Sequence, residues 1–254
     1  MRFLYKFPEL PKHSKQFIFK MLLLHPSAKI ILTRINSMEV QQMGFKQDSY
    51  RILAEQLIRK FRERNMDAVY FATAEECRTA ILQEIPEGTS VTWGGSMTIM
   101  DMGLIDAVKA APGIIAKDRT SAKTPEEKRA FYAQQTLCDY FLMSSNAITL
   151  DGQLVNIDGA GGRVACLITG PSHVFVIAGM NKVESDLDSA MKRVRNFAAP
   201  ANNLRLSHNT PCTKAGRCSD CLTPECICNQ IVITRRSMIK DRIKVFLIGE
   251  ELGY

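Results

Sequence analysis

Two glycines and a hydroxyl residue, Gly94-Gly95-Ser96, stand where a short apolar run ends and a helical pattern begins. Glycine lets a ligand approach the backbone closely, and free amides at a helix start attract an anion. The stretch fits neither the P-loop nor the G-x-G-x-x-G pattern. We expect Gly94, Gly95 and Ser96 to bind a phosphate or carboxylate. The alternative is a tight turn capped by Ser96.

A second stretch, residues 144–163, is dense in Asn, Asp, Gly and hydroxyl residues directly after an apolar run. Asp158 is the candidate catalytic residue, as a general base, or else a polar anchor. Arg163 is the candidate clamp for a carboxylate or phosphate, because its planar fork allows bidentate pairing. The alternative is a hairpin and a glycine-rich turn served by Asp151 and Asp158. The other candidate ligand-binding residues here are Ser145, Asn146, Asn156 and Gly159.

A third candidate pair, Asn181 and Lys182, follows the apolar run at 174–178. Loops at the carboxyl ends of parallel strands are where α/β sheets bind ligands. Lys182 could therefore contact an anionic substrate. The alternative is a solvated lysine on a loop.

Five cysteines occur within residues 212–228, with the spacing C-x5-C-x2-C-x4-C-x-C. Thiolates at such density bind zinc or iron–sulfur clusters, and we expect one of these two cofactors here. The spacing matches no standard ferredoxin or zinc pattern. Reduced or redox-active thiols without metal are the alternative.

The charge distribution bears on the class of partner. Residues 1–38 carry seven Lys/Arg and one acidic residue, whereas the rest of the chain carries 26 basic and 25 acidic residues. A near-neutral body lacks the basic surface that nucleic-acid binding needs. No apolar run approaches the ~20 residues of a membrane span, and no signal-peptide layout is present. We expect a cytoplasmic protein without nucleic-acid or membrane partners.

Helices and strands must alternate to position these candidate residues. Amphipathic spacing predicts helices near 46–64, 74–84, 125–137, 163–168 and 184–196, and apolar runs predict strands at 68–72, 90–93, 114–116, 140–143, 174–178, 231–234 and 244–248. Capping-box patterns open two of the helices, and Asp151-Gly152 predicts a hairpin. The fold class expected is α/β, with a largely parallel sheet flanked by helices and an antiparallel hairpin.

The first 38 residues differ from the rest, because they are basic, are broken by prolines and lack a steady period. We expect a poorly ordered extension. One interpretation is that translation starts at Met38 or Met43; the other is a targeting or docking tail. Residues 39–254 are expected to form a single domain with a cysteine-rich loop at 207–228.

Several of these motifs together resemble the LUD-domain proteins of the lactate-utilisation family. The resemblance covers residues 45–254 and is carried by MDAVYFATAEE (66–76), IPEGTSVTWGGSMT (85–98), SNAITLDGQLVNIDGAGGRVA (145–165), VFVIAGMNKV (174–183), RVRNFAAPAN (193–202), TPCTKAGRCSDC (210–221), ICN (227–229) and IGEELG (248–253). It implies a NagB/RpiA/CoA-transferase-like fold whose cleft is lined by residues 94–96, 145–149 and 158–163. It also implies a component or accessory of L-lactate oxidation to pyruvate, with a small anionic metabolite as ligand and iron–sulfur proteins as partners.

Two positions depart from the family pattern. The family usually has a polar residue, typically Asn, where this chain has Gly162, and a residue other than cysteine at Cys226. The metal-ligand set implied by the resemblance is therefore Cys212, Cys218, Cys221 and Cys228, with Cys226 as an extra thiol. Two other functions stay open: an enzyme acting on a sugar phosphate or CoA ester, and a metal- or thiol-dependent interaction module. The sequence also leaves open whether the chain is an enzyme and whether it forms a homo-oligomer.

Overall fold

The computed structural model describes residues 26–254, with side chains from residue 44 onward. Contacts divide the chain into two units, Met1–Asp48 and Ser49–Tyr254. The described part of the first unit is the start of helix α2 (Pro26–Glu63), which runs through position 38 without a break. Residues 1–25 of the predicted extension lie outside the described residues, so that expectation stays a prediction.

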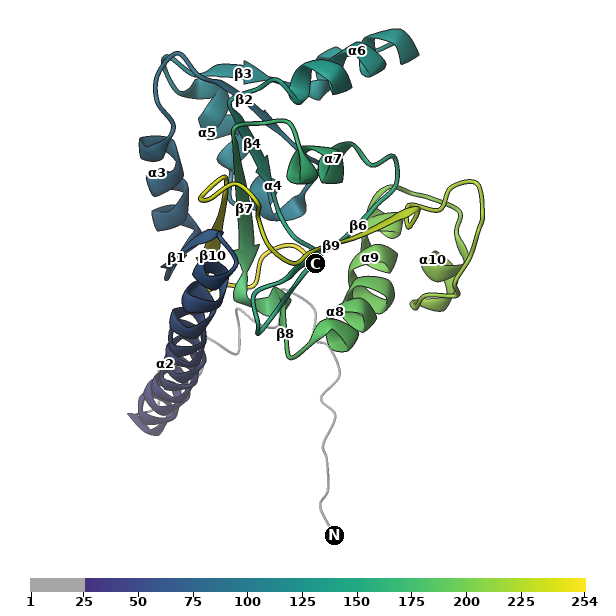
Figure 1. Cartoon of the computed structure of the whole chain (residues 1–254). Helices are drawn as coiled ribbons and strands as arrows, with labels where there is room; N and C mark the ends of the chain where they lie inside the picture. Colours follow the sequence, from purple (N-terminus) through teal and green to yellow (C-terminus); the bar gives the residue numbers. More distant parts are fainter. Residues whose placement is uncertain (1–25) are drawn as a thin grey trace. The chain divides into compact units, whose positions relative to one another are not determined.

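A parallel sheet of six strands forms the centre of the second unit (Figure 1). Its strands lie in the order β1-β10-β7-β4-β2-β3, and every neighbouring pair is parallel. In that order they span Asp67–Phe71, Ile243–Ile248, His173–Gly179, Tyr140–Met143, Ser90–Trp93 and Ile115–Lys117. The chain passes from β2 outward to β3 and then returns to β4 on the other side. The space between β2 and β4 is therefore the switch point at which such sheets bind ligands.

Alternate side chains of the central strands enter two separate cores, as the two-residue period of a strand requires. Phe141 and Met143 of β4 pack in one core with Leu57 and Phe61 of α2. Tyr140 and Leu142 of β4 pack in the other core, which also takes in side chains of helices α3 to α5. The helices α3, α4 and α5 span Ala74–Glu84, Met97–Asp101 and Leu104–Ala110, and α7, which joins the first core, spans Gly162–Ile168. The predicted α/β class is confirmed.

A second, mixed sheet has the strand order β8-β5-β6-β9. Its strands span Val183–Glu184, Ala147–Thr149, Leu154–Asp158 and Gln230–Thr234. Strands β5 and β6 are antiparallel and are joined through Asp151-Gly152, as predicted. Gly152 has a φ of +85°, and a Cβ there would lie 3.1 Å from the backbone of Lys60. Glycine is therefore required at this turn for conformation and for space.

The remaining helical segments lie in the connections between strands. They are η1 (Arg119–Ser121), α6 (Pro125–Gln135), η2 (Met180–Lys182), α8 (Leu187–Arg193), the π-helix η3 (Val194–Ala198), α9 (Ala199–Arg205) and α10 (Pro211–Ala215). Both predicted capping boxes, Thr73 with Glu76 and Thr124 with Glu127, are present. The segment predicted as a cysteine-rich loop begins with α10, which Pro211 starts at its first turn. Within residues 26–254, no helix has the length and apolarity needed to cross a membrane.

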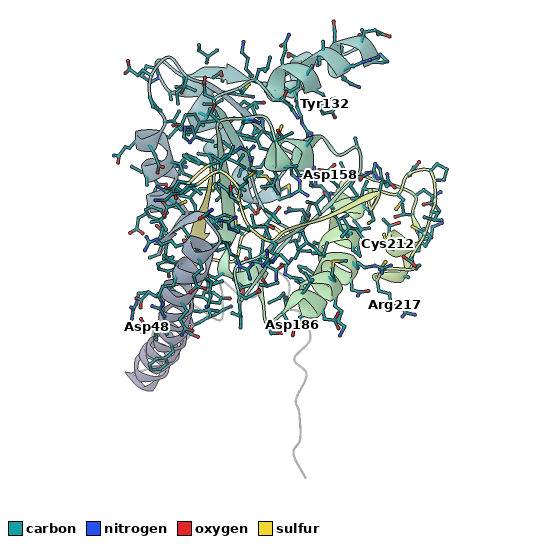
Figure 2. The ribbon with its side chains drawn as sticks, viewed as in Figure 1. Asp48, Tyr132, Asp158, Asp186, Cys212 and Arg217 are labelled. Atoms are coloured by element: carbon teal, nitrogen blue, oxygen red, sulfur yellow. The ribbon has the colours of Figure 1, made fainter. Side chains whose placement is uncertain are left out.

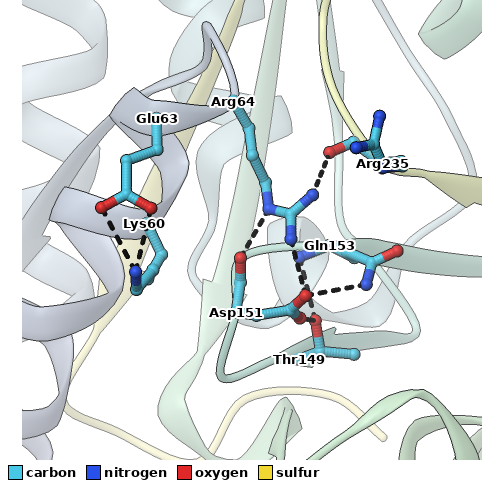
Figure 3. A network of polar contacts seen from close by, with 7 residues as sticks. All are labelled: Lys60, Glu63, Arg64, Thr149, Asp151, Gln153 and Arg235. Carbon is cyan, nitrogen blue, oxygen red and sulfur yellow. Dashed lines mark hydrogen bonds and ion pairs between the residues drawn. The ribbon is translucent and has the colours of Figure 1, made fainter.

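Arg64, just after α2, fastens the β5–β6 hairpin to this helix (Figure 3). Its Nε donates to the Asp151 carbonyl at 2.5 Å, its Nη2 to Asp151 Oδ2 at 2.6 Å and its Nη1 to the Arg235 carbonyl at 2.7 Å. Gln153 donates to the same Asp151 carboxylate at 2.9 Å, and Thr149 donates to its other oxygen. One partly buried arginine thus joins α2, the hairpin and the segment after β9.

Candidate anion-binding cleft

A cavity of about 280 Å³ lies at the carboxyl ends of β2 and β4, at the switch point of the parallel sheet. Nine of the predicted site residues line it: Gly94, Gly95, Ser96, Ser145, Asn146, Asp158, Gly159, Arg163 and Lys182. The other two, Asn156 and Asn181, are absent from the lining. The volume is at the small end of the range for ligand sites, which suits a small metabolite.

Lys182 follows β7 directly and is only 3% exposed. Its Nζ donates to Thr98 Oγ1 at 2.8 Å and to Ser144 Oγ at 3.0 Å. Within residues 44–254 no carboxylate lies at ion-pair distance from it. Burial is the main cause that lowers the pKa of Lys182 to about 7, and the nearby charges of Arg193 and Arg163 lower it further. Lys182 is therefore not the solvated loop lysine that the sequence left as an alternative.

The C-terminal segment covers Lys182. Thr98 Oγ1 donates to the Leu252 carbonyl at 3.3 Å, and a Cβ at Gly253 would lie 2.7 Å from Thr98 Oγ1 and 3.4 Å from Lys182 Nζ. Asn181 Oδ1 accepts the Leu252 amide at 3.2 Å. Asn181 thus anchors the tail that encloses the lysine.

The guanidinium of Arg163 donates hydrogen bonds to oxygens of the protein itself. Its Nη1 donates to the Ser144 carbonyl at 2.8 Å and to Asn156 Oδ1 at 2.7 Å. Its Nη2 donates to Asn146 Oδ1 and to the Ile157 carbonyl, both at 2.8 Å. Its Nε lies 3.5 Å from Asp158 Oδ2. With all five N–H groups directed at protein oxygens, Arg163 positions the loops after β4 and β6, and a ligand would have to displace one of them.

Gly94 makes room for this arginine, since a Cβ there would lie 3.0 Å from Arg163 Cγ. Asp158 Oδ1 accepts the Gly161 amide at 2.8 Å, so this carboxylate supports the turn as well as the arginine. Asn156 is fully buried, and its Nδ2 has no partner among the described residues. Asn146 Oδ1 also accepts the Ile157 amide at 3.0 Å. The same oxygen also accepts from Arg163. The Nδ2 of Asn146 is therefore the atom of this side chain that can donate to a ligand in the cavity.

Other lining residues have no motif in the sequence. Arg119 lies over Gly95, whose Cβ would be 2.8 Å from Arg119 Nη2, and its guanidinium makes no hydrogen bond or ion pair within residues 44–254. Arg205 donates to Asn202 Oδ1 at 2.8 Å from Nη2 and 3.1 Å from Nε. Tyr254 donates to the same oxygen at 3.5 Å. Arg119 follows the short strand β3, so its place after a parallel strand was the one available signal.

Tyr132 of α6 and Asp158 at the end of β6 are labelled in Figure 2, and both line the cavity. A Cβ at Gly162 would lie 2.5 Å from Tyr132 Cε1. The tyrosine ring therefore occupies the space that a side chain at position 162 would need. This accounts for the glycine at position 162, where the family usually has a polar residue.

The charged residues of the cavity wall are mostly basic: Arg119, Arg163, Arg205 and Lys182 face one acidic residue, Asp158. Asp158 is already paired with Arg163. A small anion entering this cavity would gain from the excess positive charge. The arrangement suits binding of a carboxylate or phosphate, with Lys182 as the group able to change protonation near neutral pH.

The cysteines of residues 212–228 gather beyond the cavity wall. Burial, followed by the neighbouring Cys226, raises the pKa of Cys228 to about 12, and Cys218 and Cys212 act in the same direction. A hydrogen bond from Thr223 is the main cause that lowers the pKa of the Cys221 thiol. No three His, Cys, Asp or Glu side chains of the described residues are grouped as a metal would need. The Cys228 amide donates to Cys226 Sγ at 3.4 Å, so these two thiols lie near each other.

Comparison with known proteins gives three results. A LUD-domain family model matches residues 54–248. No curated protein sequence matches the chain. Among solved structures, the chain is similar to a DUF162 family protein from Deinococcus radiodurans, with 11% identity, coverage of 78% of this chain and 98% of that chain, and a TM-score of 0.47.

Two further solved structures are more distant. eIF2B delta from Chaetomium thermophilum is 12% identical, with coverage of 47% of this chain and 50% of that chain and a TM-score of 0.33. A variant of the decarboxylase AibA/AibB is 10% identical, with coverage of 41% and 58% and a TM-score of 0.29. The family model, in contrast, spans most of this chain, including both sheets and the cavity between β2 and β4. The chain therefore belongs to the LUD-domain family.

Proposed function

We propose that this protein takes part in the oxidation of L-lactate to pyruvate, as a component or accessory that binds a small hydroxy- or oxo-acid in the cleft between β2 and β4. The supporting observation is a small, predominantly basic cavity in a chain of the LUD-domain family. Within residues 44–254, Arg119 has donors without a hydrogen-bond partner, and so does the amide nitrogen of Asn146. These groups could receive a carboxylate without disturbing Arg163.

Genetics tests the role in metabolism. Deletion of the gene should abolish or slow growth on L-lactate as the carbon source, and the intact gene supplied in trans should restore it. Growth on pyruvate should be unaffected, because the proposed step precedes pyruvate. Equal growth of the deletion and parent strains on L-lactate would contradict the proposal. Iron–sulfur proteins are the expected partners, and co-purification of the full chain under anaerobic conditions would identify them.

An enzyme acting on a sugar phosphate or a CoA ester is the competing function for the same cavity. The basic wall also suits a phosphate. A sugar phosphate and an acyl-CoA that raise the melting temperature, with no effect of L-lactate or pyruvate, would favour this competitor. A rise in melting temperature with L-lactate or pyruvate, and none with the sugar phosphate or the acyl-CoA, would exclude the competing function.

A second candidate function is a metal-dependent interaction module at residues 212–228. The observation in its favour is the proximity of the thiols: the Cys228 amide donates to Cys226 Sγ at 3.4 Å, and Cys218 and Cys212 act on Cys228 in the same direction as Cys226. The full chain, prepared anaerobically, should then contain iron with labile sulfide or zinc, and Cys218→Ser should lower the metal content. Metal-free protein whose fold and partners are unchanged by Cys218→Ser would contradict this function.

A further inference from the structure

We propose that Lys182 is a nucleophile of this cleft, and that its amine condenses with the carbonyl carbon of a bound 2-oxo acid to form an imine. The inference rests on the proposed function, because it takes the ligand of the cavity to be such an acid. It adds a covalent step and a residue to carry it.

The first argument is the isolation of the amine. Lys182 is 3% exposed and lines the cavity, yet within residues 44–254 its Nζ hydrogen-bonds only to the hydroxyls of Thr98 and Ser144. Buried ammonium groups are normally paired with a carboxylate, since burying an unpaired charge is costly. Asp101 acts on Lys182 through space and favours its protonated form, but among the described residues the two form no ion pair. A buried lysine left without an acid is suited to act as a neutral amine.

The second argument is the charge around the amine. Arg163 and Arg193 both disfavour its protonated form, and burial acts in the same direction. Arg163 is fixed by its loops, and Arg193 is fixed by the carbonyl of Asn146 at 2.7 Å, so neither cation can move away. A lysine in such surroundings keeps a large fraction of nucleophilic amine near neutral pH, which is the condition for imine formation.

The third argument is the position of the two hydroxyls. In the condensation the amine lone pair attacks the carbonyl carbon, the C–N bond forms, and the carbonyl oxygen takes one proton from the nitrogen. The resulting carbinolamine loses this hydroxyl as water together with the second amine proton, leaving a C=N bond. No electrons are gained or lost overall. Thr98 Oγ1 and Ser144 Oγ, at 2.8 and 3.0 Å from Nζ, are placed to relay both protons.

Reductive trapping tests the inference on the full chain. Pyruvate and sodium cyanoborohydride are added near neutral pH, and the product is measured by intact mass and peptide mapping. We expect one adduct per chain on the peptide that contains Lys182, with the mass of pyruvate less water plus two hydrogens. Lys182→Arg should reduce the adduct at least about tenfold, because a guanidinium is not a nucleophile. The matched control Lys192→Arg changes an exposed lysine on α8 and should match the wild type.

Each result decides the matter. If Lys182→Arg fails to fold, the site of modification in the wild type remains decisive. An adduct spread over exposed lysines, or unchanged in Lys182→Arg, would overturn the inference. Calorimetry with pyruvate and with L-lactate separates the two proposals. Saturable binding of either acid without trapping overturns the imine but leaves the proposed function, whereas the absence of trapping together with the absence of binding of both acids overturns both.

Discussion

At the residue scale, the two cations deepest in the cleft have different freedom. Arg163 directs every N–H group at protein oxygens, whereas two hydroxyls are the only hydrogen-bond partners of the Lys182 amine among the described residues. The sequence pointed to both as anion ligands, because Arg and Lys after parallel strands commonly bind anions. Arg163 is instead bound by the Ser144 and Ile157 carbonyls, which lie just after β4 and near the end of β6, and Lys182 is bound by hydroxyls of Thr98 and Ser144, which lie far from it in the sequence. No local pattern could have predicted this.

Removing the Arg163 side chain should mainly lower the stability of the fold, because its donors bind protein oxygens rather than a ligand. We expect Arg163→Ala to lower the free energy of unfolding by roughly 3–5 kcal/mol, because Asp158 and several buried oxygens lose their partner. Urea denaturation measures this change. Arg119→Ala changes an exposed arginine that has no ion pair among the described residues, and it should change stability by less than about 0.5 kcal/mol. Equal stability of Arg163→Ala and wild type would show that Arg163 is not a structural residue.

The buried amine should also give stability a particular pH dependence. The pKa of Lys182 is about 7 in the folded protein, below the value of roughly 10.4 for a free lysine. Between these values the unfolded chain binds more protons, so this residue makes stability rise with pH across that window. Below pH 7 both states are protonated, and the full penalty of burying the charge remains. Lys182→Met should therefore raise the melting temperature at pH 6 more than at pH 9.

The comparison of Lys182→Met with wild type depends on the charged groups that act on Lys182. Arg163 and Arg193 lower the pKa of Lys182, and Asp101 raises it. None of them is altered in Lys182→Met. A difference in melting temperature between variant and wild type that is constant with pH would contradict a depressed pKa at this lysine.

At the element scale, local signals predicted most of the architecture. Capping boxes at Thr73 and Thr124, the Asp151-Gly152 hairpin and the strands at 90–93 and 140–143 were all found as expected. The long helix α2, which begins at Pro26, was not expected to start before residue 46. Helix α10 was also missed, because the dense cysteines suggested a loop at 207–228, and α9 was missed because the helix predicted before it was taken to end at residue 196.

The contact between α2 and the β5–β6 hairpin gives a stability prediction of its own. Arg64→Ala should lower the free energy of unfolding by about 1–3 kcal/mol, since it removes three hydrogen bonds from a largely buried side chain. Lys60→Ala, which removes the exposed pair with Glu63 drawn in Figure 3, is the matched control and should cost less than about 1 kcal/mol. Thermal and urea unfolding of the two variants would compare them, and a similar loss in both would contradict the special role of Arg64.

Asp151 should make the same contact sensitive to acid. Burial alone would raise its pKa, but hydrogen bonds from Thr149 and Gln153 and the charge of Arg64 lower it. A carboxyl with a depressed folded pKa stabilises the protein above its unfolded value of about 3.9 and loses this contribution as the pH falls through the folded pKa. Asp151→Asn should therefore weaken the protein at neutral pH, with a difference from wild type that shrinks in acid. A difference that stays constant down to acid unfolding would contradict this.

At the scale of the whole domain, the cleft and the cysteine segment share a wall. Ile227, between Cys226 and Cys228, lines the cavity and would lie 3.5 Å from a Cβ at Gly159. Asn229 donates to the Gly159 carbonyl at 3.3 Å. A change in the state of the thiols would therefore reach the ligand cavity through one loop contact. The meeting of Arg119, Tyr254 and the 94–96 loop at the same cavity likewise results from the sheet order, which the sequence pattern alone did not specify.

The central claim, that the cleft receives a small carboxylate, is tested most directly by calorimetric titration of the full chain with L-lactate and with pyruvate. We predict saturable binding of at least one of them, no binding of the uncharged analogue L-lactamide, and about ten- to a hundredfold weaker binding in Arg119→Ala, which loses one charge-assisted contact. Absence of heat with both acids, or equal binding of lactate and lactamide, would contradict the claim.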